Sequence, residues 1–242
     1  MSWFETWKRK LILNFVEGDR WRYLTDGLIL TMQITAGALV IGLAIGIVVS
    51  IIRSAHDQIG KKNLIGPGGI LLRLLNTVAR VYLTVIRGTP TLVQLLLIYF
   101  VFLINMESKV AVAIIAFGIN SGAYLAEIFR SGIMSIDKGQ MEAGRSLGLS
   151  YVKTMQKIIL PQAFKNTLPA LINEIITLLK ETSISGWIGL NDLTRGAEII
   201  KGVTFEALLP LLAAALVYLI IVMIFTWIMG KIERRLRESD RR

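Results

Sequence analysis

The chain has 242 residues, 54% of them hydrophobic, and its mean hydropathy is +0.61. It contains no cysteine and one histidine, which excludes disulfides, thiolate metal sites, cysteine nucleophiles and a histidine-rich metal site. The formal net charge is +10, but the basic residues lie between apolar runs. This distribution indicates a membrane protein rather than a nucleic-acid-binding protein.

The first 23 residues are amphipathic and charged. They lack an apolar core followed by a small-residue cleavage site, so we do not expect a cleaved signal peptide. We predict instead an amphipathic helix over residues 3–23 that lies on the outer membrane surface. Its aromatic anchors are Trp3, Trp7, Trp21 and Tyr23.

Long apolar runs follow this segment. A transmembrane helix needs roughly 20 apolar residues to cross about 30 Å of hydrocarbon. We predict five spans, at residues 27–52, 88–106, 110–126, 164–190 and 207–230. The fourth is interrupted by Glu174, Lys180 and Glu181, whereas the others carry no charge. The sequence therefore predicts an all-α, polytopic membrane protein with one membrane domain, residues 24–236, and a basic tail, residues 237–242.

Small residues and proline indicate where helices pack or end. Gly42 and Gly46, four residues apart in the first span, predict close helix packing. Residues 66–69, Gly-Pro-Gly-Gly, predict a turn. Residues 88–90 predict a break at the start of the second span, because Pro90 disfavours helix at the residue before it.

Basic residues are distributed unevenly between the two sets of loops. The segments after spans one, three and five contain Arg53, Lys61, Lys62, Arg73, Arg80, Arg87, Arg130, Lys138, Arg145, Lys153, Lys157, Lys165, Lys231, Arg234, Arg235, Arg237, Arg241 and Arg242. The opposite loops contain Lys109, Arg195 and Lys201. By the positive-inside rule, the first set and the C-terminus are cytoplasmic and the N-terminus is outside. The basic residues of the N-terminal segment oppose this assignment but are fewer.

Polar residues inside the predicted spans recur at helical spacing. Three stripes at i, i+4 and i+7 are Arg87, Thr91 and Gln94; Asn120, Tyr124 and Glu127; and Asn173, Thr177 and Lys180. Each stripe lies on one helix face, and Glu174 and Glu181 border the third. Charge at membrane depth is costly and usually faces a protein interior or cavity, so the stripes predict a shared hydrophilic path. The alternative is hydrogen bonding between packed helices, which is at least as well supported for Thr91 and Asn120.

The polar segment between the third and fourth spans predicts a short helix over about residues 137–150. Asp137 followed by Gln140 is a capping-box pattern that marks its start. Glu142 and Arg145 are three residues apart and can pair on one face. The small residues predict a low face for close approach of a partner, and the proline predicts a break before the fourth span. These residues are Ala143, Gly144, Gly148, Leu160 and Pro161.

The same segment carries a family motif. Residues 142–148 are Glu-Ala-Gly-Arg-Ser-Leu-Gly, and after nine residues comes Ile-Ile-Leu-Pro at 158–161. This resembles the EAA-x3-G-x9-I-x-LP loop of ABC-importer permeases, with Gly144 where the third small residue is usually alanine. Residues 86–90, 120–128 and 178–183 extend the resemblance to the permeases for polar amino acids (histidine, glutamine, glutamate, arginine and cystine).

The resemblance implies a type I ABC-importer permease fold with a cytoplasmic coupling helix, in the bacterial cytoplasmic membrane. The ATPase-coupling residues would be Glu142, Ala143, Gly144, Arg145, Gly148, Leu160 and Pro161, and the gate Arg87, Gly88, Thr89 and Pro90. We assign the substrate path to Gln94, Asn120, Tyr124, Glu127, Asn173, Glu174, Thr177, Lys180 and Glu181. Arg87 can instead snorkel to the membrane interface.

The partners expected from the resemblance are ATPase subunits, an extracytoplasmic substrate-binding protein and a second identical or related permease, besides membrane lipid and an amino acid substrate. Nucleic acid is not expected. The chain lacks a phosphate-binding G-x4-G-K-[ST] motif, so we expect ATP and Mg to bind the partner ATPase and no cofactor or metal to bind this chain.

Two other classes of function stay open. An ion-coupled secondary amino acid carrier would explain charged residues in the spans, but such carriers usually contain two repeats, and none is evident here. A membrane-embedded enzyme would need a nucleophile or a metal site, and the sequence offers neither. Among amino acid substrates, the acidic Glu127, Glu174 and Glu181 favour a cation, although Lys180 and Arg87 can neutralise them.

Overall fold

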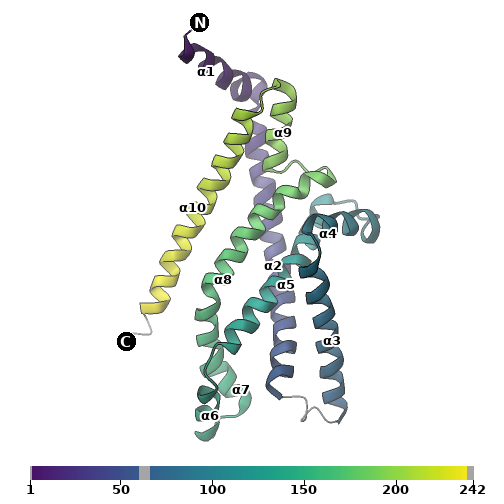
Figure 1. Ribbon diagram of the computed structural model, residues 1–242, viewed down its shortest axis with the longest axis vertical. Coiled ribbons are helices and arrows are strands. Elements are labelled where there is room, and N and C mark those ends of the chain that lie inside the picture. The colour runs from purple at the N-terminus through teal and green to yellow at the C-terminus, as the bar shows by residue number, and fades with distance from the viewer. Residues whose placement is uncertain (1, 60–65, 239–242) are drawn as a thin grey trace. The chain divides into compact units, whose positions relative to one another are not determined.

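The computed structural model describes residues 2–59 and 66–238, and regular structure within these ranges is helical (Figure 1). In chain order the helices are α1 (Trp3–Leu11), α2 (Trp21–Ile59), α3 (Gly66–Gly88), α4 (Thr91–Leu97), α5 (Lys109–Met134), α6 (Lys138–Ser146), α7 (Tyr151–Thr154), α8 (Leu160–Glu181), α9 (Leu193–Thr204) and α10 (Leu208–Glu238). The wider π-helical turns are η1 (Ile12–Val16), η4 (Ile98–Phe102) and η5 (Met155–Ile159), and the tighter 3-10 turns are η2 (Glu17–Asp19) and η6 (Thr182–Ile188). The prediction of an all-α protein is confirmed.

Four helices in the described part of the chain are long and apolar enough to cross a membrane, namely α2, α3, α5 and α10. Helix α3 was not among the predicted spans. The turn predicted at residues 66–69 is wrong, because these residues form the first turn of α3, where proline's missing N–H leaves no bond unmade. The predicted second span is shorter in the structure, covering Thr91–Phe102. The count of five spans stays a prediction.

Three of the predicted helix boundaries can be compared with the structure. The break at residues 88–90 is confirmed, since α3 ends at Gly88 and α4 begins at Thr91. The fourth predicted span ends earlier than expected, because α8 stops at Glu181 and η6 follows. At the C-terminus α10 continues to Glu238, so it includes the start of the predicted tail, whose residues 239–242 lie outside the described residues.

The chain divides into two compact units. Unit 1 comprises residues 1–38, 91–117 and 176–227, and unit 2 comprises residues 39–90, 118–175 and 228–242.

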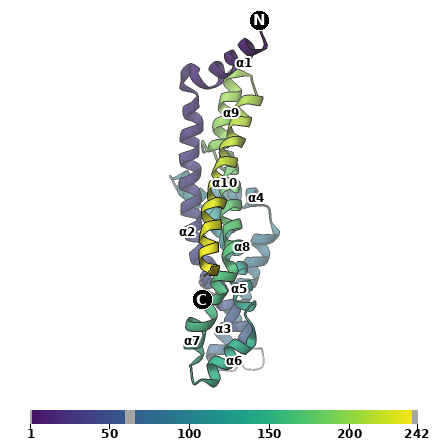
Figure 2. The ribbon, with the colours of Figure 1, turned by 90° about the vertical axis from the view of Figure 1, so that its left-hand side faces the viewer.

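In unit 1, α9 packs against the N-terminal part of α2 and the first turns of α10 (Figure 1 and Figure 2). Leu193, Ala197 and Ala214 form the buried centre of this contact. Gly196 permits the close approach, because a Cβ there would lie 2.3 Å from the carbonyl oxygen of Tyr23. Burial of these apolar surfaces stabilises the packing of α9.

The N-terminal segment of unit 1 is not the single amphipathic helix predicted for residues 3–23. Helix α1 ends at Leu11, and η1 and η2 precede α2. The reason is local backbone geometry: Gly18 and Asp19 adopt positive φ angles of 63° and 52°, which no α-helix accommodates. A 3.0 Å ion pair between Lys10 and Glu206 joins α1 to the residues after α9.

In unit 2, α3 and the C-terminal half of α2 lie side by side (Figure 1), and both pack on α5. Leu83, Ala123 and Ala126 form the buried centre, with Val49 and Tyr82 against it. The predicted packing role of Gly42 and Gly46 is confirmed. A Cβ on Gly46 would lie 2.8 Å from the Leu125 Cβ, and one on Gly42 would lie 3.3 Å from the backbone nitrogen of Gly122.

Candidate functional site

The short helix α6 begins where the sequence predicted. Asp137 is its N-cap, and the carboxylate oxygen Oδ1 accepts a 2.7 Å hydrogen bond from the Gly139 N–H. This bond satisfies one of the backbone donors left free in the first turn of a helix.

The C-terminal end of α6 is a Schellman turn. The Leu149 N–H donates to the Gly144 carbonyl at 3.1 Å, and the Gly148 N–H donates to the Arg145 carbonyl at 3.0 Å. This pair of bonds requires a left-handed residue after the cap, and Gly148 supplies it with φ +81°. The turn reverses the chain into α7, whose N-cap is Ser150. Gly148 is therefore needed for its backbone conformation as well as for its small size.

The small residues that were predicted to form one low face of α6 lie on two different faces in the structure. Gly144 is buried inward, where a Cβ would lie 2.5 Å from the Thr154 Cγ2. Ala143 and Leu147, four residues apart, are exposed on another face, and Leu147 is 81% exposed. We call Ala143 and Leu147 the outer ridge of α6. A large apolar side chain so exposed on a short polar helix is suited to contact with a partner.

Two expectations about this segment are wrong. Arg145 does not pair with Glu142; its Nη1 lies 3.5 Å from the Leu149 carbonyl oxygen, at the Schellman turn. Leu160 and Pro161 do not break the chain, because α7, η5 and α8 follow one another without a non-helical residue. Pro161 lies in the first turn of α8, and the wider π-helical turn η5 precedes it.

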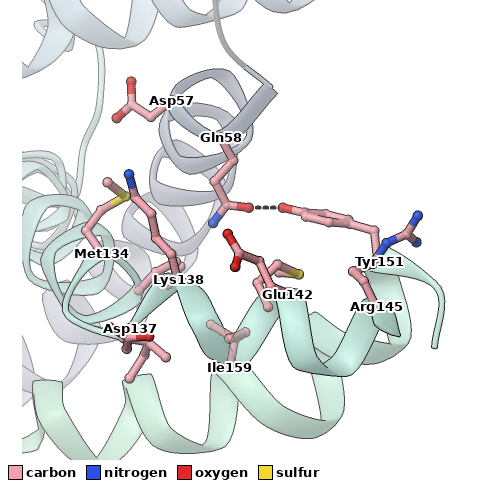
Figure 3. A pocket seen from close by; sticks show the side chains of 12 residues that line it. Asp57, Gln58, Met134, Asp137, Lys138, Glu142, Arg145, Tyr151 and Ile159 are labelled. Atoms are coloured by element: carbon pink, nitrogen blue, oxygen red, sulfur yellow. Dashed lines mark hydrogen bonds between the residues drawn. The ribbon is translucent and has the colours of Figure 1, made fainter. Parts of the chain in front are cut away.

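A cavity of about 480 Å³ lies between α6, α7 and the ends of α2 and α5 (Figure 3). Lys138 and Glu142 point from α6 toward the end of α2 that carries Asp57 and Gln58. At the rim, the Tyr151 hydroxyl donates a hydrogen bond to the Gln58 Oε1. Burial raises the pKa of the Tyr151 hydroxyl, so it stays protonated and able to donate at neutral pH. The pair joins α7 directly to α2.

A chain of ion pairs surrounds Glu127 on α5. Its Oε2 lies 3.0 Å from the Arg130 Nη2 and 3.9 Å from the Arg87 Nη1. Arg130 Nη1 also lies 3.5 Å from the Asp57 Oδ2, and the Arg87 guanidinium lies 5.6 Å from the centre of the Tyr124 ring. The predicted gate residue Arg87 and the path residues Tyr124 and Glu127 are thus neighbours. Arg130 already neutralises Glu127 at the shortest of these distances.

The other predicted path residues of unit 2 differ in their surroundings. Asn120 is 2% exposed, whereas Asn173 is exposed. Glu174 accepts a 2.7 Å hydrogen bond from the Ser121 hydroxyl, which joins α8 to α5. The predicted gate residues Gly88, Thr89 and Pro90 are exposed between α3 and α4.

In unit 1, the predicted path residue Gln94 is 7% exposed and lies on α4. Thr177 and Lys180 are exposed on the last two turns of α8, and Glu181 at its end is partly exposed. The role of all these residues in a substrate path stays a prediction.

Comparison with known proteins identifies the family. Residues 67–238 match the model of the binding-protein-dependent transport system inner membrane component. The chain belongs to this family. It is an ABC-importer permease, a multi-pass protein of the bacterial inner membrane, and the ion-coupled carrier is set aside.

Relatives and solved structures agree along nearly the whole chain. An arginine transport system permease protein, ArtQ, of Bacillus subtilis is 38% identical over 90% of this chain and 94% of its own length. A putative glutamine transport system permease protein, GlnP, of Rickettsia typhi is 38% identical over 88% and 93%, and the L-cystine permease TcyB of Bacillus subtilis is 34% identical over 92% and 90%. The crystal structure of an amino acid ABC transporter with histidines aligns at TM-score 0.77 and 36% identity, over 97% and 99%. The methionine transporter MetNI, inward facing, shares the fold at TM-score 0.72 and 19% identity, over 88% and 96%. The predicted resemblance to amino acid ABC permeases is confirmed.

Sequence reasoning missed several residues of these clusters. Arg130 stands three residues after Glu127, the spacing of a helical ion pair, so it could have been found. Leu147 lies within the motif, as the large apolar residue that caps the C-terminal end of a mostly polar helix. Tyr151, Gln58 and Ser121 gave no signal, because their contacts join segments far apart in the sequence.

Proposed function

We propose that this permease, with a second permease subunit, forms the membrane path for a polar amino acid. Two copies of a separate ATPase bind ATP and Mg on the cytoplasmic side and supply the energy. A substrate-binding protein delivers the amino acid from outside. The amino acid names of the relatives support the substrate class, and the family supports the partners.

The observation that carries this proposal is the exposed outer ridge of α6, together with the contacts that fix the position of this helix. The Asp137 cap, the Schellman turn at Gly148 and the inward packing of Gly144 hold the helix at both ends and along one side. The exposed Leu147 then fits an apolar recess of the ATPase, as buried anchor residues do in protein interfaces. Because Tyr151 bonds to Gln58, a displacement of the hairpin formed by α6 and α7 also moves the end of α2.

The charges around the predicted path revise the expectation of a cationic substrate. Glu127 is paired with Arg130, and Glu174 accepts the Ser121 hydroxyl bond, so neither is a bare negative charge. Lys180 is exposed on the same face of α8 as the polar Asn173 and Thr177. This face suits the carboxylate and polar groups that every polar amino acid carries. We infer that the permease accepts a polar amino acid with no net charge and that Lys180 contacts the α-carboxylate of this substrate.

The test is ATP hydrolysis by the assembled transporter in proteoliposomes with its binding protein, screened across the twenty amino acids. We expect stimulation by one or a few polar amino acids. Lys180→Met should then reduce uptake about tenfold or more, the loss typical of a charge-assisted hydrogen bond, while Glu181→Gln has the smaller effect. Hydrolysis that no amino acid stimulates would contradict the proposed substrate class. Equal uptake by the Lys180→Met variant would contradict its role.

A further inference from the structure

Five charged side chains line the cavity between the α6–α7 hairpin and the ends of α2 and α5 (Figure 3). They are Asp57, Asp137, Lys138, Glu142 and Arg145. Three of these side chains already have partners. Asp57 faces Arg130 at 3.5 Å, whereas Asp137 caps α6 and Arg145 lies against a backbone carbonyl of the Schellman turn.

The two remaining side chains, Lys138 and Glu142, have opposite charges. The Lys138 ammonium and the Glu142 carboxylate make no ion pair or hydrogen bond within the described part of the chain. They are four residues apart, so they lie on one face of α6, and both point toward the end of α2 (Figure 3). An unpaired ammonium and an unpaired carboxylate at one cavity match a ligand that carries both charges.

The orientation of Glu142 separates it from the outer ridge of α6. The family motif places Glu142 among the expected ATPase-coupling residues. Ala143, the next residue, belongs to the outer ridge and is rotated by about 100° around the helix. An ATPase that contacts the outer ridge therefore leaves the Glu142 carboxylate facing the cavity.

The rest of the cavity provides an apolar wall. Ile133, Ile136, Met141 and Ile159 contribute to its lining. Its volume of about 480 Å³ lies in the usual range of small-molecule sites, about 300 to 1,000 Å³. An α-amino acid with an aliphatic side chain carries the two charges and the apolar surface that this lining can bind.

We propose that this cavity binds a free aliphatic amino acid as its zwitterion. The ligand carboxylate contacts Lys138, its ammonium group contacts Glu142, and its side chain packs on the apolar wall. Both polar contacts are charge-assisted hydrogen bonds, so a ligand with only one of the two charges binds more weakly. The bound amino acid joins α6 to the wall of the cavity and opposes displacement of the hairpin. This effect on transport rests on the proposed function, whereas the binding itself does not.

The test is hydrogen–deuterium exchange of the assembled transporter in nanodiscs, read by mass spectrometry on peptides from α6 and α7. L-Leucine is the probe, because its side chain is aliphatic and the proposed transport substrate is polar. Binding stabilises the closed hairpin, so exchange there should fall about tenfold when leucine is present at about ten times its dissociation constant. Exchange at the end of α8, where the substrate path is predicted, should not change.

A variant of Lys138 tests the carboxylate contact. Lys138→Gln should weaken leucine binding about tenfold or more, because it removes a charge-assisted hydrogen bond. Lys138 is exposed in the first turn of α6, so folding should not change. Lys153→Gln makes the same change of charge at an exposed position of α7 that does not line the cavity. It is the matched control and should bind leucine as the wild type does.

Two leucine analogues test the requirement for both charges. Isocaproate lacks the ammonium group and isoamylamine lacks the carboxylate, so each should protect the wild-type hairpin much less than leucine does. In Lys138→Gln, leucine and isoamylamine should become equivalent, because the partner of the carboxylate is gone. In Glu142→Gln, leucine and isocaproate should become equivalent for the corresponding reason.

Several outcomes would overturn the proposal. One is exchange in α6 and α7 that leucine does not slow, and another is equal protection by leucine in Lys138→Gln and Lys153→Gln. Isocaproate as effective as leucine would show a simple anion site instead.

A second measurement tests the effect on transport. Leucine added on the ATPase side of proteoliposomes should slow substrate-stimulated ATP hydrolysis by the wild type but not by Lys138→Gln. A protected hairpin with unchanged hydrolysis would overturn this effect. Hydrolysis that no amino acid stimulates would contradict the proposed function alone, because protection of the hairpin by leucine does not depend on transport.

Discussion

At the scale of single residues, Gly148 is required for its backbone conformation. Its φ of +81° lies in the left-handed region, and no atom lies within 4 Å of the position of an added Cβ. Space is therefore free, and conformation alone limits the side chain. A left-handed conformation costs most residues about 1 to 2 kcal/mol, whereas asparagine tolerates it.

This contrast gives a prediction. Gly148→Asn should keep most of the substrate-stimulated ATP hydrolysis of the assembled transporter, because the Schellman turn can still form. Gly148→Val should lose most of it, because a β-branched residue resists positive φ. Both are compared in proteoliposomes at equal amounts of assembled complex. Equal activity of the two variants would mean that the turn is not required for coupling.

Asp192 is a second residue whose geometry makes a prediction. It is fully buried and caps α9. Its Oδ1 accepts from the N–H groups of Thr194 and Arg195 at 2.8 and 3.1 Å, and its Oδ2 accepts from the Ser185 hydroxyl at 2.9 Å. Asp192→Ala should lower the free energy of unfolding by about 1 to 3 kcal/mol, since it removes a cap and leaves buried donors unpaired. Asp192→Asn keeps an acceptor and should cost less.

The difference in stability between the wild type and Asp192→Asn should decrease as pH rises. Burial raises the pKa of the Asp192 carboxyl, because desolvation outweighs the hydrogen bonds that favour its charged form. As pH rises above about 3.9, the unfolded chain ionises first and the wild type loses part of its stability. The melting temperature of Asp192→Asn should therefore approach that of the wild type from pH 4 upward. A gap that widens with pH would show that the folded carboxylate is stabilised instead.

At the scale of elements, α6 makes a prediction through its outer ridge. Leu147→Asp should weaken co-purification of the ATPase about tenfold or more, as removal of a central apolar anchor usually does. Leu147→Met, which keeps the apolar volume, should retain most of the binding and serves as the control. If the ATPase co-purifies equally with both variants, the ridge does not contact it.

The elements also show how far the sequence predicts this fold. The cap at Asp137, the break before α4 and the close packing of Gly42 and Gly46 follow from local rules and are confirmed. Helix α3 was missed because its arginines interrupt the hydropathy that marks a span. The inward direction of Gly144 was missed because it depends on Thr154, which packs against it only after the chain has turned.

The candidate site, like the fold, could be predicted from the sequence only in part. Helical spacing predicted that Tyr124 and Glu127 share a face, and they do lie beside Arg87. Spacing could also have predicted the pairing of Arg130 with Glu127, which are three residues apart. It could not predict the contact between Arg130 and Asp57, since Asp57 comes from a distant helix. Expectations of substrate charge based on counting acidic residues therefore overstate the negative charge.

At the scale of the whole molecule, the absence of cysteine allows a direct test of the path. Thr177→Cys, exposed on α8, should react with a small water-soluble thiol reagent, and its rate should change when the assembled transporter is trapped with ATP. Val48 is 56% exposed and lies in the apolar run of residues 27–52, away from the three polar stripes, so we expect Val48→Cys to stay inert. Labelling of Val48→Cys as fast as Thr177→Cys, in every nucleotide state, would remove the evidence for a path at α8.

The π-helical turn η5 sets a requirement on chain length. A π turn holds about one residue more than an α turn, and one residue rotates a helix by about 100°. Deleting one residue of η5 would convert it into a regular α turn and leave the direction of the outer ridge nearly unchanged, because the wide turn already holds the extra residue. Inserting a residue there would exceed what η5 holds and would rotate the outer ridge by about 100° relative to α8. Among changes of length in the nine residues that separate Gly148 from Ile158, we therefore expect a deletion within η5 to be tolerated better than an insertion, as measured by substrate-stimulated ATP hydrolysis.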